Sequence, residues 1–229
     1  MSGDIGSISL SGGPATLDVT GIDKSAHERI GGVRTGSMSW KAFFNPATGL
    51  THDKLAALPT ADVICTYARG TTLGNPAACQ TSKQINYDGT RADSGEFTFQ
   101  VEAQCNGFGL EWGQQLTAGK RTDSAATNGT SIDTVASAAF GAQAYLQAFS
   151  FTGTDVTVKI QDSADNSTFA DVTGLTFTQI TAGPTAERIA TASGATVRRY
   201  LRVSTTTTGG FSSLAFSVVV VKNTVATSF

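Results

Sequence analysis

Residues 96–105 read EFTFQVEAQC, and this short stretch decides the fold class. From Phe97 to Cys105 every odd-numbered residue is apolar, and every even-numbered residue is polar. Side chains that alternate with a period of two belong to a β-strand with one face in a core and the other in water. The stretch therefore predicts a half-buried strand and favours an all-β protein.

The same alternation recurs along the chain, whereas strong helix formers are scarce. Further strands are expected at residues 5–10, 17–20, 38–44, 63–67, 145–151, 156–160, 175–180, 197–204 and 214–221. The last of these reads LAFSVVVV and is apolar on both faces at its end, which predicts burial on both sides. One short helix is expected over residues 51–58, with Thr51 as its N-cap and Pro59 as its stop. Residues 23–30 are expected to form a second helical turn.

Residues 121–140 are rich in small polar side chains and have no apolar period, as is typical of a linker or an extended arm. We therefore expect one β domain over residues 1–120 and a second over residues 141–229. The predicted fold is an N-terminal β-barrel or sandwich with a short helix, followed by a C-terminal β-sandwich of the jelly-roll type.

Composition excludes several classes of protein. The 229 residues carry a formal net charge of −2, which argues against a dedicated nucleic-acid binder because phosphate binding needs a basic face. No run approaches the ~18 apolar residues of a membrane-spanning helix, so we expect no membrane insertion. The first residues show no secretory leader. The cysteines Cys65, Cys79 and Cys105 are odd in number and are expected to be reduced thiols.

No catalytic constellation emerges from the sequence. The GxSxG and HExxH motifs are missing, and GQQLTAGK at residues 113–120 has one residue too many for a phosphate loop. Arg121 also stands where that loop needs Ser or Thr. The acidic run at residues 162–171 fits a tight turn better than a calcium loop. We therefore expect no enzyme activity, no catalytic or metal site and no cofactor.

Residues 17–46 read LDVTGIDKSAHERIGGVRTGSMSWKAFFNP. A D-x-T core, a polar loop carrying Glu-Arg, a glycine turn and an aromatic-Asn-Pro end follow one another before the expected helix. This order resembles the N-terminal half of the major tail proteins, or tail tube proteins, of siphophages. The segments at residues 67–75, 83–87 and 108–122 resemble tail proteins of actinobacterial siphophages in particular.

The resemblance implies a tail-tube-type β domain and a virion structural protein that assembles itself into stacked, hexameric rings in the cytoplasm of the host. The implied partners are other copies of the chain, other tail and head–tail connector proteins, and genomic DNA that passes through an acidic or neutral lumen without tight binding. Residues 20–34 and 117–138 are the candidates for ring stacking. The residues assigned to subunit interfaces are Asp18, Thr20, Glu28, Arg29, Arg34, Asn45, Lys120 and Arg121.

The second half resembles a different group of proteins. Residues 159–173 and 199–203 are similar to patterns in galactose-binding-like jelly rolls and in accessory domains of virion proteins. Glycan contacts would then fall to Arg199, Tyr200 and Arg202. Two alternatives stay open, a capsid decoration or minor tail protein and a carbohydrate-binding tail adhesin. A glycosidase ranks last, because the acidic residues form no preferred pair.

Overall fold

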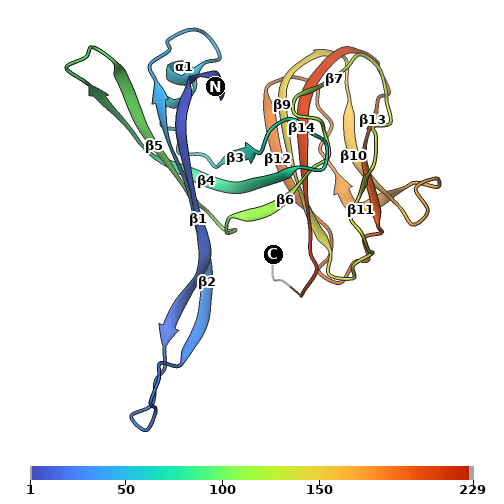
Figure 1. The fold of residues 1–229 in the computed structure, drawn as a ribbon. Coiled ribbons are helices and arrows are strands. Elements are labelled where there is room, and N and C mark those ends of the chain that lie inside the picture. The colour runs from blue at the N-terminus through green and yellow to red at the C-terminus, as the bar shows by residue number, and fades with distance from the viewer. Residues whose placement is uncertain (1, 227–229) are drawn as a thin grey trace. The chain divides into compact units, whose positions relative to one another are not determined.

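The computed structural model describes residues 2–226 and is built almost wholly of antiparallel strands, which confirms the all-β prediction (Figure 1). No sheet within residues 2–226 closes into a barrel. The chain forms two compact units. The first unit contains Met1–Cys65 and Gln80–Leu110, and the second contains Thr66–Cys79 and Glu111–Phe229. Two strands, β3 (Val63–Ala68) and β4 (Pro76–Arg91), contribute residues to both units.

The first unit is built on a sheet of four long strands and has one short helix. It also contains residues 63–65 of β3, a strand that pairs with β4. The order of the four long strands is β1-β2-β5-β4. The other elements of the unit are η1 (Ser2–Asp4), β1 (Ile5–Asp18), β2 (Arg29–Phe43), α1 (Thr51–Leu55), β5 (Phe97–Cys105) and residues 80–91 of β4. The expected alternation in β5 holds from Phe99 onward, since Val101 and Ala103 are fully buried and Gln100 and Gln104 are exposed. It fails at the start of the strand, where Phe97 is exposed and Thr98 is buried.

The apolar face of this sheet is the side that is covered. Ile8, Trp40 and Val101 lie in one row across β1, β2 and β5, and Leu10, Met38 and Ala103 lie in the next. At the end of this face Leu110 packs against two glycines of the hairpin, and a Cβ at Gly36 would lie 2.6 Å from the Leu110 nitrogen. Glycine is therefore needed there for the close approach.

Two of the expected helical features are wrong. Leu50 occupies the N-cap position of α1 without any side-chain cap, while the hydroxyl of Thr51 donates to Asp4 Oδ2 at 2.6 Å. Thr51 thus ties the helix to the N-terminal turn instead of capping it. No helix forms over residues 23–30, because they belong to the tip of the β1–β2 hairpin and β2 begins at Arg29.

The second unit is a β-sandwich, as predicted for the C-terminal half. One sheet has the order β6-β14-β9-β12. Residues 76–79 of β4 pair with β6 in this sheet, and β7 pairs with β14. The other sheet has the order β11-β10-β13-β8. The strands are β6 (Glu111–Gln115), β7 (Arg121–Asp123), β8 (Ile132–Asp133), β9 (Ala142–Gly153), β10 (Thr157–Ser163), β11 (Ala170–Thr176), β12 (Thr185–Ala190), β13 (Tyr200–Thr206) and β14 (Phe211–Lys222).

The core of the second unit lies between these two sheets. Leu146, Phe216 and Val218 of one sheet and Ile160 and Leu201 of the other are all fully or almost fully buried in it. Burial on both faces of the valine run at residues 218–221 is confirmed, since all four side chains are buried.

Residues 121–140 are part of the second unit rather than a free linker or arm. They contain β7, which pairs with β14, and β8, which pairs with β13. Their polar side chains serve as hydrogen-bond partners: the Thr205 hydroxyl donates to Asp123 Oδ2 at 3.0 Å, and the Thr127 amide donates to Thr205 Oγ1 at 2.9 Å. The polar composition of residues 121–140 therefore reflects hydrogen bonding to neighbouring strands of the second unit.

Candidate functional site

The sheet of the first unit has one open edge at β1 and another along residues 86–91 of β4. The earlier part of β4 is paired with β3, whose first residue, Val63, accepts a hydrogen bond from the Ser82 hydroxyl at 3.1 Å. Among residues 2–226, β1 pairs with β2 and with no other strand. On the opposite side, residues 86–91 of β4 pair with β5 alone in the described chain. An edge strand presents unpaired N–H and C=O groups and is a template for pairing with another chain.

The directions of the strands make the two edges compatible with each other. Each neighbour in the order β1-β2-β5-β4 is antiparallel to the next. The two edge strands of a four-stranded antiparallel sheet run in opposite directions, so β4 of one copy can pair antiparallel with β1 of the next. This contact is heterologous, and a heterologous contact repeats into a ring when its rotation closes.

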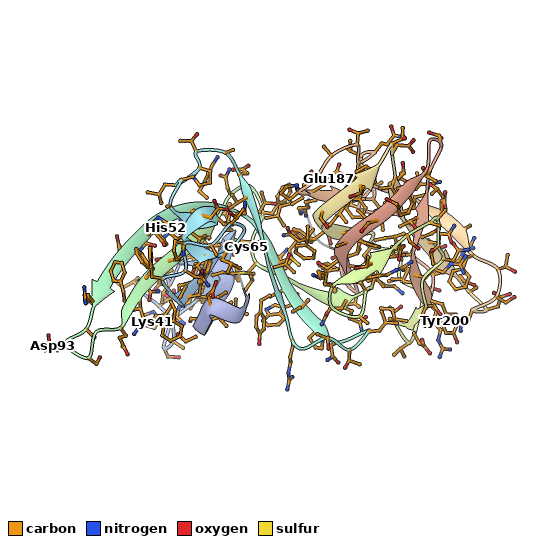
Figure 2. All side chains as sticks on the ribbon, turned by 90° about the horizontal axis from the view of Figure 1, so that it is seen from above. Lys41, His52, Cys65, Asp93, Glu187 and Tyr200 are labelled. Carbon is orange, nitrogen blue, oxygen red and sulfur yellow. The ribbon has the colours of Figure 1, made fainter. Side chains whose placement is uncertain are left out.

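The uncovered side of this sheet is polar except for the exposed Phe43 at one end, and we call it the polar face. It consists of three rows that cross β1, β2, β5 and β4 in register. The rows are Ser7–Lys41–Gln100–Asp88, Ser9–Ser39–Glu102–Asn86 and Ser11–Ser37–Gln104–Lys83. These twelve side chains include two lysines and two acids, so the face has no net charge (Lys41 is labelled in Figure 2).

The β1–β2 hairpin continues beyond the rest of the first unit (Figure 1). β5 pairs with β2 from Ser37 to Phe43, so residues 13–36 form a ribbon of two strands. This ribbon exposes five large apolar side chains, and Ile22 at its tip is fully exposed. The five are Leu17, Val19, Ile22, Ile30 and Val33. Pro14 lies on the edge strand of the ribbon, where its missing N–H limits further strand pairing.

The tip of the hairpin brings together three of the predicted interface residues. The amide of Thr20 donates to Asp18 Oδ1 at 3.0 Å, and the amide of Glu28 donates to Thr20 Oγ1 at 2.9 Å. His27 Nδ1 lies 2.9 Å from Asp18 Oδ2. Hydrogen bonds from the Thr20 hydroxyl and amide lower the pKa of the Asp18 carboxyl. These contacts hold the tip in one shape.

Arg29 and Arg34 also lie on the hairpin, opposite Asp18 and Pro14 respectively. Asn45 lies elsewhere in the first unit, where its side-chain amide donates to Asp4 Oδ1 at 3.0 Å. The structure thus places five of the eight predicted interface residues on one ribbon and gives Asn45 an internal contact.

The remaining two predicted interface residues belong to the second unit. Lys120 is exposed just before β7. Arg121 donates from Nε and Nη2 to the two carboxylate oxygens of Asp123, at 2.7 and 2.8 Å, and its guanidinium lies over the Phe216 ring. Arg121 is therefore engaged within its own unit.

The three residues predicted to contact a glycan lie together on one sheet of the second unit. Tyr200 and Arg202 share the outer face of β13, because Leu201 and Val203 between and after them are fully buried. Arg199 precedes the strand and lies over the Tyr200 ring, 5.0 Å from its centroid. Its guanidinium donates to both oxygens of Asp133, at 2.7 and 2.6 Å.

The open edge of β4 and the polar face have no counterpart among the predictions from sequence. The polar half of the alternation in β5 was visible, but its neighbours in β1 and β2 are mostly serine and glycine, which carry no strong pattern.

In the described part of the chain no group of three His, Cys, Asp or Glu side chains is placed to hold a metal ion. None of the helices described is long and apolar enough to cross a membrane.

No protein-family model and no curated protein matches this chain. Among solved structures it is similar to the SPP1 Dit (gp 19.1) protein, described as a paradigm of hub adsorption apparatus in Gram-positive infecting phages. The alignment covers 94% of this chain and 93% of that chain, at 10% sequence identity and a TM-score of 0.25.

Proposed function

We propose that the protein is a structural subunit of a phage tail, and that its first unit assembles head to tail into rings that stack into the tail tube. The single observation that carries this proposal is the pair of open, antiparallel-compatible edges on one four-stranded sheet. The resemblance of residues 17–46 to major tail proteins supplies the biological setting. The expected ring is a hexamer, and the working object is the polymer rather than the single chain.

The two faces of the sheet suit opposite sides of such a ring. The apolar face is already covered by residues of the first unit, whereas the polar face is open. A closed ring of these sheets would have a lumen lined by serine, glutamine and balanced charges. DNA held by many lysine–phosphate contacts could not pass, since each contact adds affinity. A polar face without net charge therefore suits a conduit for a genome.

The exposed ribbon at residues 13–36 supplies a contact along the tube axis. Isolated apolar side chains on a surface are ordinary, but five on one narrow ribbon mark a segment that is completed by a partner. The strand direction carries the ribbon away from the sheet, so it would reach a neighbouring ring rather than the same ring. We assign stacking to this ribbon; residues 117–138, the other candidate, are paired within the second unit.

A capsid decoration or minor tail protein is the second candidate function, and the exposed ribbon is also compatible with it. Purified full-length protein should be imaged by negative-stain microscopy, with its mass measured by light scattering. Rings of six or tubes with a regular axial repeat support the tail tube. Trimeric knobs would favour decoration, and a strictly monomeric particle at high concentration would overturn the proposal.

A further inference from the structure

The outer face of β10 and β13 in the second unit carries an ordered group of polar and aromatic side chains. Val158 and Ile160 of β10 and Leu201 and Val203 of β13 are fully buried, so the alternate residues point outward. Phe169, just before β11, and Asp171, near the start of β11, lie beside them. We call this group the outer patch; it consists of Lys159, Gln161, Phe169, Asp171, Tyr200 and Arg202 (Tyr200 is labelled in Figure 2).

Arg202 is held in a fixed orientation at the centre of the outer patch. Its guanidinium carbon lies 4.0 Å from the centroid of the Phe169 ring. Its Nε donates to Gln161 Oε1 at 2.9 Å, and Gln161 Nε2 in turn donates to Asp171 Oδ1 at 2.8 Å. A ring on one side and an amide at Nε fix both the plane and the rotation of the cation, which reduces the entropy lost when it binds a ligand.

The other basic groups nearby already have carboxylate partners. Lys159 Nζ lies 3.0 Å from Asp171 Oδ2, and Arg199 Nη2 lies 2.6 Å from Asp133 Oδ2. Arg202 forms no ion pair with any residue between 2 and 226, and its two terminal nitrogens make no hydrogen bond there. The outer patch therefore presents four free N–H donors on a planar, oriented cation.

A free guanidinium fork matches a carboxylate, which it can bind through two parallel hydrogen bonds. The ring of Tyr200 and the amide of Gln161 lie on the same face, and aromatic and amide groups suit a hydroxyl-rich ligand. We propose that the outer patch binds a saccharide that carries a carboxylate, with Arg202 holding the carboxylate and Tyr200 contacting the sugar.

An acidic peptide fits this surface less well. Peptides that bind sheets usually add a strand at an open edge. Both β10 and β13 are paired on each side, β10 with β11 and β13, and β13 with β10 and β8. Their main-chain groups are therefore occupied. The edge strand beside β10 is β11, and the charge of its Asp171 repels an acidic peptide that would add there.

This inference concerns the second unit by itself and does not depend on ring assembly. Binding can be measured on the purified full chain by titration calorimetry at low salt, whatever its oligomeric state. The probes are polygalacturonate, neutral dextran and polyglutamate. We expect polygalacturonate to bind, dextran to bind far more weakly, and polyglutamate to bind more weakly than polygalacturonate. Equal binding of dextran would overturn the role of the carboxylate, and stronger binding of polyglutamate would identify an acidic-peptide site instead.

Variants locate the binding. Arg202→Gln should weaken polygalacturonate binding by about tenfold or more, as expected for the loss of a charged hydrogen-bond pair. Arg202→Lys keeps the charge but loses the planar fork, so its affinity should fall as well, and it guards against misfolding of the first variant. Arg69→Gln removes the same charge from an exposed loop of the second unit and should change nothing. Three results would contradict the proposal. The first is unchanged binding in Arg202→Lys, the second is an equal loss of binding in Arg202→Gln and Arg69→Gln, and the third is no binding of polygalacturonate to the wild type.

Discussion

Arg188 of β12 and Glu111 of β6 form an ion pair within the second unit, with Arg188 Nη2 3.2 Å from Glu111 Oε1 and both side chains more than nine-tenths buried. Tyr145 of β9 completes the group: its hydroxyl donates to Glu111 Oε2 and accepts from Arg188 Nε at 3.0 Å. Burial, followed by the Glu111 charge, raises the pKa of the Tyr145 hydroxyl, so the tyrosine stays protonated and can donate.

Removing one partner of this pair should be costly. We expect Arg188→Met to lower the free energy of unfolding by about 3–5 kcal/mol, because it leaves the Glu111 carboxylate buried without a counter-ion. The double variant Glu111→Gln/Arg188→Met should recover a large part of that loss. Urea denaturation of the three proteins measures both values. Equal losses in the single and double variants would show that the pair is not coupled.

The close approach of Leu110 to the hairpin makes a second prediction about stability. Gly36→Ala should destabilise the first unit by about 1–3 kcal/mol, because its Cβ would overlap the Leu110 backbone nitrogen. Gly13→Ala is the matched control in the same hairpin, since a Cβ there meets nothing within 4 Å. Thermal unfolding should separate the two variants. An equal shift in both would mean that Leu110 can move away without loss.

The Asp133–Arg199 pair predicts an acid-dependent change in stability. Hydrogen bonds from Arg199 lower the pKa of Asp133 to about 2. A carboxyl whose pKa is lowered by folding stabilises the protein above its unfolded pKa of about 4, and that contribution is lost as the pH falls toward 2. Melting temperatures between pH 5 and pH 2 should therefore fall less steeply for Asp133→Asn than for the wild type. If the melting temperatures of Asp133→Asn and the wild type fall equally steeply with pH, the ion pair with Arg199 does not lower the pKa of Asp133 as assigned.

The apolar side chains of the hairpin should serve assembly and not folding. Ile22→Asp and Val33→Asp should leave the melting temperature of the single chain unchanged, because both side chains are largely exposed. The same variants should shorten or abolish tubes in electron micrographs while rings persist, since the ribbon is assigned to stacking. Val225→Asp, at another exposed apolar residue outside the ribbon, provides the control. Tubes of normal length from Ile22→Asp would contradict the assignment.

Much of the fold could be predicted from hydrophobic alternation. Strands such as β5 and β14 bury one or both faces, and burial is what leaves a pattern in the sequence. The long β1–β2 hairpin was predicted only in pieces, at residues 5–10, 17–20 and 38–44. Its middle exposes both faces, so nothing selects alternating apolar residues there. The turn chemistry of residues 23–30 was then mistaken for a helical turn.

The candidate site could be predicted only in part. The residues from Asp18 to Arg34 are proposed for subunit contacts because their order resembles that of a known family. The open edges are properties of strand order, and strand order depends on pairings between segments far apart in the sequence. Residues 121–140 are packed although their composition predicts a linker. Their polar side chains make hydrogen bonds to residues far away in the sequence, and no local pattern reveals such bonds.

The most direct test of the central claim is disulfide cross-linking between the two edges. Ser9 of β1 and Asp88 of β4 lie on the polar face, and residues opposite each other on paired strands have Cβ atoms about 4.5–5.5 Å apart. Non-reducing gels should compare the parent chain with the double variant Ser9→Cys/Asp88→Cys. The neighbouring pairs, in which Ser7 or Ser11 is combined with Asn86 or Thr90, should be tested in the same way. We expect a ladder of covalent oligomers that ends at a closed ring of six for at least one combination, and no ladder from either single variant. Dimers from Ser9→Cys alone, or no cross-linking from any combination while particles form, would contradict the central claim.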